Sequence, residues 1–177
     1  PTKISIDNSF FVKAKDVAVG TTSPLGGFYI RTSEPILMRG MTLPVMIGGA
    51  PGQANNISAV EMLINYQKIK GIVDSEGSIF FKEEILIPKG DSAIVVYGVP
   101  SEKFSDGQTI TLSERFWKDD TKSVGTASGR VISFPKEEVV MSTMTVRNKK
   151  TVRGLLQAFI PDFLAGRANE KTPEKLN

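Results

Sequence analysis

The sequence predicts a mainly β protein, an antiparallel β-sandwich or jelly-roll-like fold with a short C-terminal amphipathic helix. Short apolar segments rich in β-branched residues recur along most of the chain, and turn-forming residues separate them. After residue 150 the apolar spacing changes to i, i+3 and i+4, which is typical of one helical face. We therefore expect a β-sandwich domain over 1–150, an amphipathic helical segment over 151–166 and a disordered tail over 167–177.

The expected strands are apolar, β-branched runs that stop at turn signals. A break at 33–35, a glycine-rich loop at 48–53 and turn residues at 88–90 and 105–107 separate them. The strands predicted in this way are 3–7, 10–19, 28–31, 36–39, 43–47, 78–87, 93–99, 109–117, 129–134 and 139–146.

Two of these segments differ in the burial that their pattern predicts. In 109–117, Ile110, Leu112 and, after a slip, Phe116 alternate with polar residues, so one face of that strand should be exposed to water. Residues 93–97 are apolar on both faces, which predicts a central strand that is covered on each side.

Residues 56–71 carry signals for both helix and strand. Ser58 and Glu61 form a capping box, and Lys70 with Gly71 suits a helix end. Against a helix, the apolar residues from Val60 onward alternate at period two. This alternation, together with strand-like flanking sequence, favours strand.

The chain contains no cysteine and no histidine, which excludes several chemistries. Without cysteine, disulfides and cysteine-ligated zinc or iron–sulfur sites are ruled out. Without histidine, serine–histidine and cysteine–histidine nucleophiles and histidine-dependent zinc hydrolases are ruled out unless a partner supplies the base. We therefore predict no catalytic residue, no metal site and no cofactor.

The other chemical candidates are better interpreted as ordinary surface structure. Adjacent carboxylates at 83–84, 119–120 and 137–138 point to opposite faces of a strand and are expected to be solvated. The glycine-rich loop lacks P-loop spacing, and residues 74–77 predict a hairpin turn. Ser101 and Lys103 are a close serine–lysine pair, which we interpret as a polar loop. A carboxylate pair drawn from distant strands remains a route to enzyme activity.

One basic cluster stands out against a weakly positive chain, whose 22 Lys and Arg against 19 Asp and Glu give a net charge of +3. The cluster consists of Arg147, Lys149, Lys150 and Arg153, in a stretch from 139 to 161 that has no acidic residue. It suits the phosphates of nucleic acid or an anionic lipid surface, although a solvated linker is the favoured interpretation.

The C-terminal helical segment carries an apolar stripe that needs burial, and Pro161 bends it. Its polar face holds Gln157 and Asp162 and is too poor in cations for a membrane-surface helix. The stripe packs either on the chain's own sheet, which is the default, or on a neighbouring copy as a subunit interface. Its residues are Val152, Leu155, Leu156, Phe159, Ile160, Phe163 and Leu164.

No apolar run reaches the roughly 20 residues that span a bilayer, and residues 1–3 lack the core of a secretory signal. We expect no transmembrane segment, and the sequence does not indicate a compartment. With many strands, no catalytic set and an apolar terminal segment, the sequence predicts a non-enzymatic structural protein that self-assembles as a homo-oligomer, such as a coat, shell, virion or appendage subunit. The alternatives are a binding module, for nucleic acid through the basic arm or for carbohydrate or protein, and a histidine-free carboxylate enzyme.

Overall fold

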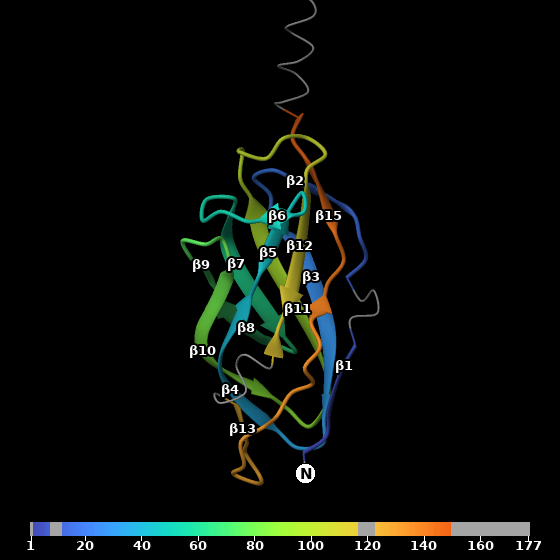
Figure 1. Cartoon of the computed structure of the whole chain (residues 1–177), viewed down its shortest axis with the longest axis vertical. Helices are drawn as coiled ribbons and strands as arrows, with labels where there is room; N and C mark the ends of the chain where they lie inside the picture. Colours follow the sequence, from blue (N-terminus) through green and yellow to red (C-terminus); the bar gives the residue numbers. More distant parts are fainter. Residues whose placement is uncertain (1, 8–11, 117–122, 150–177) are drawn as a thin grey trace, which may run out of the picture.

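The computed structural model describes residues 2–7, 12–116 and 123–149, and this part of the chain is mainly β-strand in several antiparallel sheets (Figure 1). The predicted helical segment at 151–166 and the predicted tail at 167–177 lie outside the described residues. Within the described ranges, no helix has the length and apolar character to cross a membrane.

The strands follow each other with short connections along the chain. They are β1 (Ile4–Asp7), β2 (Asp16–Ala18), β3 (Ser23–Thr32), β4 (Ile36–Leu43), β5 (Val45–Ile47), β6 (Ala50–Pro51), β7 (Ile57–Ile64), β8 (Gln67–Lys70), β9 (Ile72–Val73), β10 (Ile79–Ile87), β11 (Gly90–Pro100), β12 (Thr109–Glu114), β13 (Ser123–Gly125), β14 (Val139–Val140) and β15 (Met144–Arg147).

These strands form three sheets. A five-stranded sheet has the order β1-β3-β11-β7-β8, and a four-stranded sheet has the order β13-β4-β10-β9. The third sheet has the order β2-β15-β12-β5-β6, with β14 paired to β12. Neighbouring strands are antiparallel except β2 and β15, which pair in parallel. The N-terminal part of the chain thus contributes one strand to the first sheet and one to the third.

The first and third sheets share a core, which aromatic contacts mark. Phe28 of β3 meets Phe116, just after β12, edge to face with ring centroids 5.5 Å apart. Phe116 in turn stacks on Phe134 at 4.9 Å. A Cβ at Gly26 of β3 would lie 2.6 Å from the sulfur and 3.1 Å from the Cβ of Met141, so a larger residue there would force the Met141 side chain to shift.

The sequence pattern of residues 93–97 predicts a central strand covered on both faces. These residues do form a central strand, but only one of its faces is fully buried. They lie in β11, the central strand of the five-stranded sheet. Ile94 and Val96 are fully buried, whereas Ala93, Val95 and Tyr97 on the other face are half-buried. One face of this sheet therefore packs on the core, and the other remains partly exposed.

Residues 57–70 form a β-hairpin, in line with the period-two pattern. β7 and β8 pair antiparallel, and the pairing of Ile64 with Gln67 leaves a two-residue loop. Asn65 in this loop has φ 51°, the left-handed conformation that such loops need and that asparagine tolerates. The capping box did not determine the structure, because alternate side chains of β7 are buried in the core.

Several predicted strands differ from the structure in extent, and the predicted strand 139–146 divides into β14 and β15. Of 10–19, the described part forms only β2. Residues 129–134 make only an isolated bridge between Val131 and Val124. Gly129 has φ +66° and ends the turn that follows β13, and Pro135 comes next, so a regular strand does not extend through this segment.

β11 sets the distance between two ends of the molecule. It contains 11 residues, and at about 3.3 Å per residue it spans roughly 35 Å. We call the end where β1 and β11 begin the distal end, because Thr32 pairs there with both Ile4 and Gly90. We call the other end the exit end, because β15 leaves the described fold there. At this end the backbone N–H of Val19 donates to the carbonyl of Arg147, and the N–H of Gly20 donates to the carbonyl of Pro100. In Figure 1 the distal end is at the bottom and the exit end is at the top.

Candidate functional site

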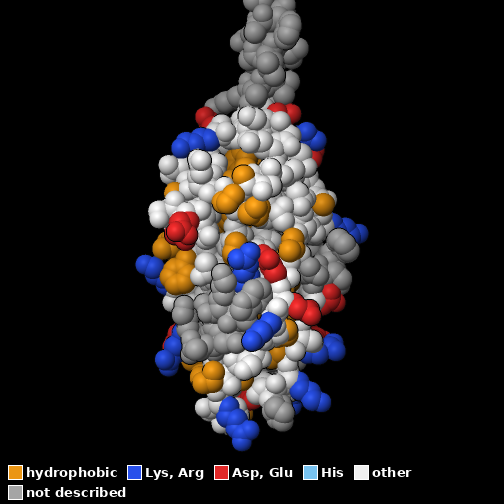
Figure 2. Space-filling model, in the orientation of Figure 1, with side chains coloured by type: hydrophobic (Ala, Val, Ile, Leu, Met, Phe, Trp, Pro, Cys, Tyr) orange, Lys and Arg blue, Asp and Glu red, His pale blue; other side chains and the backbone are white. Residues whose placement is uncertain are grey.

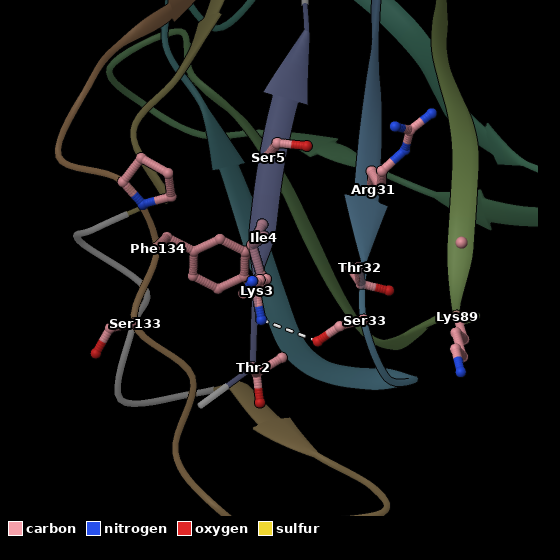
Figure 3. A pocket seen from close by; sticks show the side chains of 12 residues that line it. Thr2, Lys3, Ile4, Ser5, Arg31, Thr32, Ser33, Lys89, Ser133 and Phe134 are labelled. Carbon is pink, nitrogen blue, oxygen red and sulfur yellow. Dashed lines mark hydrogen bonds between the residues drawn. The ribbon is translucent and has the colours of Figure 1, made fainter.

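A hollow with a volume of about 880 Å³ lies at the distal end, beside β1. Residues of β1, the end of β3, the start of β11 and the segment 133–135 form its walls (Figure 3). Its lining consists of Thr2, Lys3, Ile4, Ser5, Arg31, Thr32, Ser33, Lys89, Gly90, Ser133, Phe134 and Pro135.

A second hollow, of about 310 Å³, continues along β1 towards Glu137, Glu138 and Val139. The two hollows share Ile4, Ser5 and Pro135. We call them together the β1 groove. β1 is the edge strand of its sheet and pairs with β3 on one side, so its other edge faces the groove. An edge strand can act as a template for an added chain segment.

The floor of the β1 groove is apolar and its rim is polar. Ile4 and Ile6 alternate with Ser5 and Asp7, so β1 turns its isoleucines towards the core cluster. In Figure 3 the ring of Phe134 lies beside Ile4, and the backbone N–H of Lys3 donates to the Ser33 hydroxyl at 2.9 Å. The arrangement suits a ligand that buries apolar groups on the floor.

Cations dominate the rim of the larger hollow. Arg31 binds Asp91 through two hydrogen bonds, one of them 2.8 Å long from Nη2 to Oδ2. This contact raises the pKa of Arg31 and lowers the pKa of Asp91, since each stabilises the charged form of the other. Lys3 and Lys89 are exposed, and within the described ranges neither lies in an ion pair. Figure 2 shows Lys and Arg side chains spread over the molecule, with several of them towards the lower, distal end.

The carboxylate of Glu34 links three segments at the start of the groove, and we call this set of contacts the carboxylate clamp. Glu34 accepts hydrogen bonds from the Thr2 hydroxyl and from the N–H and hydroxyl of Ser128, the latter two at 2.9 and 3.0 Å. The Thr2 contact, followed by the Ser128 contacts, lowers the pKa of Glu34. The clamp therefore joins the residues before β1, the loop before β4 and the turn after β13.

An aliphatic row crosses the outer face of the four-stranded sheet at the same end. Leu86 pairs with Leu37, Leu37 with Val124, and Val124 with Val131 across adjacent backbones. Residues directly opposite each other project to the same side of a sheet. Leu86 and Val131 are 49% and 62% exposed, so the row presents apolar surface to solvent.

The acidic side chains of the described residues test the prediction for the adjacent carboxylates. No group of three or more His, Cys, Asp or Glu that could hold a metal occurs in the part of the chain that the structure describes. Of the adjacent carboxylates, Glu84 pairs with Arg39 at 3.5 Å and Glu138 with Arg115 at 3.2 Å. These pairs fit solvated surface charge.

The structure places only part of the predicted basic cluster. Arg147 ends β15, and its guanidinium lies 2.9 Å from Asp16 and 3.8 Å from Asp106. Asp16 and then Asp106 raise the pKa of Arg147. Lys149 is exposed, while Lys150 and Arg153 lie outside the described residues. Although no acidic residue lies near Arg147 in the sequence, Asp16 and Asp106 lie beside it in the fold.

The predicted interface stripe, Val152, Leu155, Leu156, Phe159, Ile160, Phe163 and Leu164, also lies outside the described residues. Conversely, the sequence analysis missed the β1 groove and the aliphatic row. The alternation of Ile4 to Asp7 and the pair Phe134-Pro135 were visible, but the pattern does not reveal that these two segments face each other.

No family model and no curated protein matches the chain. Among solved structures, the chain is similar to AvmM, which catalyses macrocyclization in alchivemycin A biosynthesis, with a TM-score of 0.37 and 10% identity over 83% of this chain and 89% of that chain. It is also similar to a CARDB domain from Pyrococcus furiosus in complex with di-metal ions, with a TM-score of 0.31 and 9% identity over 82% of this chain and 90% of that chain. At this level, neither likeness bears on the function of the chain.

Proposed function

We propose that this chain is a non-enzymatic β-sandwich subunit that functions by assembling with copies of itself. The observation that carries the proposal is the β1 groove, in which an edge strand borders an apolar hollow of about 880 Å³. Strand edges and apolar grooves of this kind bind chain segments rather than supplying reactive groups.

The strand order supports a sandwich of the immunoglobulin type over a jelly roll. In that type, one sheet has the order A-B-E-D and the other contains C, F and G. The orders β1-β3-β11-β7 and β15-β12-β5 correspond to these two sheets. The parallel pair of β2 with β15 corresponds to a first strand that is divided between the sheets.

Two alternatives have less support. An enzyme would need convergent acids in a cleft, whereas the larger hollow is lined by Lys3, Arg31 and Lys89 with hydroxyl side chains. Nucleic-acid binding through the basic cluster has less support, because the charge of Arg147 is partly neutralised by Asp16 and Asp106.

The test is light scattering after size exclusion, over a range of protein concentrations and with nuclease treatment. Self-assembly predicts a mass that rises with concentration, is unaffected by nuclease and is retained at high salt. Retention is expected because the apolar contact is not screened. A nucleic-acid complex would lose mass with nuclease and weaken steeply with salt. A mass that stays at the monomer value of 19.3 kDa at every concentration would exclude the proposal.

A further inference from the structure

We propose that the β1 groove is the docking site for the apolar C-terminal segment, residues 151–166, of a neighbouring copy, so that the copies join head to tail. This inference deepens the proposed self-assembly and rests on it. It assigns one surface to receive and another to be inserted, which self-assembly alone does not.

The first argument is the position of the two ends. The described chain leaves the third sheet after β15, at the exit end, where Arg147 bonds Val19 and Gly20 bonds Pro100. The β1 groove lies at the distal end, where Ile4 and Gly90 pair with Thr32. The whole length of β11, roughly 35 Å, separates them.

The second argument is reach. The last described residue, Lys149, lies beyond β15 at the exit end, and the stripe begins three residues later at Val152. A chain spans at most about 3.6 Å per residue in any conformation, so Leu156, seven residues after Lys149, lies no more than about 25 Å from it. That limit is shorter than the separation of the two ends. The first half of the stripe therefore does not reach the groove of its own copy, whereas the groove of a copy stacked beyond the exit end is adjacent.

The third argument is chemical fit. The stripe includes Phe159, Ile160 and Phe163, which need burial, and the groove offers the exposed Pro135 and the half-buried Ile4, with the buried Phe134 beneath them. The aliphatic row that ends at Leu86 and Val131 adds exposed apolar surface at the same end. These apolar surfaces thus lie where a neighbour's segment would arrive.

The absence of cysteine makes a disulfide test clean. Two full-length variants are prepared, Ser5→Cys in the β1 groove and Leu156→Cys in the stripe. They are mixed under mild oxidation, and disulfide-linked dimers that contain one of each are quantified. The matched control replaces Ser5→Cys with Ser105→Cys, an exposed serine at the exit end. Docking predicts roughly tenfold or more of the mixed dimer over the control, because a bound segment has a high effective concentration at the groove.

The outcomes separate the docking proposal from self-assembly. A mass that rises with concentration without enrichment of the Ser5→Cys pair overturns the docking and leaves self-assembly standing. A chain that stays monomeric overturns both. The double variant Ser5→Cys/Leu156→Cys, oxidised at high dilution, tests whether the segment occupies the groove of its own copy. A disulfide closed within one monomer would mean that it does, and would overturn docking on a neighbour.

Discussion

At the scale of single residues, several side chains hold the distal end in shape, and Glu34 is the one whose contribution depends on pH. Its hydrogen bonds from Thr2 and Ser128 lower its pKa below the ordinary value of 4.5. A carboxyl whose pKa is depressed by folding stabilises the protein above its unfolded pKa and loses that contribution as pH falls through the folded value.

We predict that Glu34→Gln lowers the free energy of unfolding at neutral pH, and that its difference from the wild type shrinks as pH falls below about 4.5. Urea titrations at pH 7 and at a series of acid pH values measure this difference. Glu83→Gln, at an exposed position of β10, is the control. A deficit that is equal at all pH values would show that the carboxylate charge is not what Glu34 contributes.

Gly77 is a second residue whose identity the geometry requires. It has φ +81° in the turn before β10, and a Cβ there would lie 2.2 Å from the backbone carbon of Gly52. Gly107 has φ +84° with open space around it, so it separates backbone strain from steric overlap.

We predict that Gly107→Ala costs about 1–2 kcal/mol from strain alone. Gly77→Ala should cost about 3 kcal/mol or more, since the backbone of the 48–53 loop must also move. Chemical denaturation of both variants measures the two values. Equal losses would contradict the close contact between the turn and this loop.

At the scale of elements, Asn148 fixes the loop between β11 and β12 to the end of β15. The residue is 4% exposed, and its side-chain amide donates to the carbonyls of Glu102 and Phe104 at 3.3 and 2.7 Å. Its backbone N–H donates to Asp106 at 2.9 Å. These contacts determine where the chain leaves the described fold.

Replacing this amide with a carboxylate of the same shape, Asn148→Asp, places oxygen against two carbonyl oxygens. We predict a loss of about 2–3 kcal/mol at neutral pH, the cost of unsatisfied buried polar groups. Thermal and urea unfolding provide the measurement. Asn55→Asp, at an exposed loop position, should change stability by less than about 0.5 kcal/mol. Similar losses in both variants would refute the role given to the Asn148 amide.

The sequence predicted the positions of the strands better than the contacts between them. Apolar, β-branched runs between turn signals located β1 and β10, and period-two alternation located β7 and β12. It did not identify the contacts between distant segments. Asp16 and Arg147 are 131 residues apart in the chain and still form an ion pair. The β1 groove has the same origin, since Phe134 comes to lie beside Ile4 only through the fold.

At the scale of the whole molecule, the head-to-tail proposal differs from a symmetric dimer in a measurable way. A two-fold interface uses the same surface on both copies and closes at two, whereas a head-to-tail interface uses two different surfaces and grows unless it closes into a ring. Each surface can be disabled separately, because the β1 groove and the C-terminal segment lie in different parts of the chain.

We predict that Ser5→Arg, which fills the groove, and Phe159→Asp, which disrupts the stripe, each leave the chain monomeric when studied alone. Mixed together, they should form a dimer and nothing larger, because only the intact groove of the Phe159→Asp variant and the intact segment of the Ser5→Arg variant can combine. Glu83→Arg, at an exposed position midway along β10 and away from both ends, is the control and should assemble like the wild type. Analytical ultracentrifugation distinguishes these species. A Phe159→Asp variant that still dimerises by itself would point to an interface between like surfaces, with the groove playing no part in it.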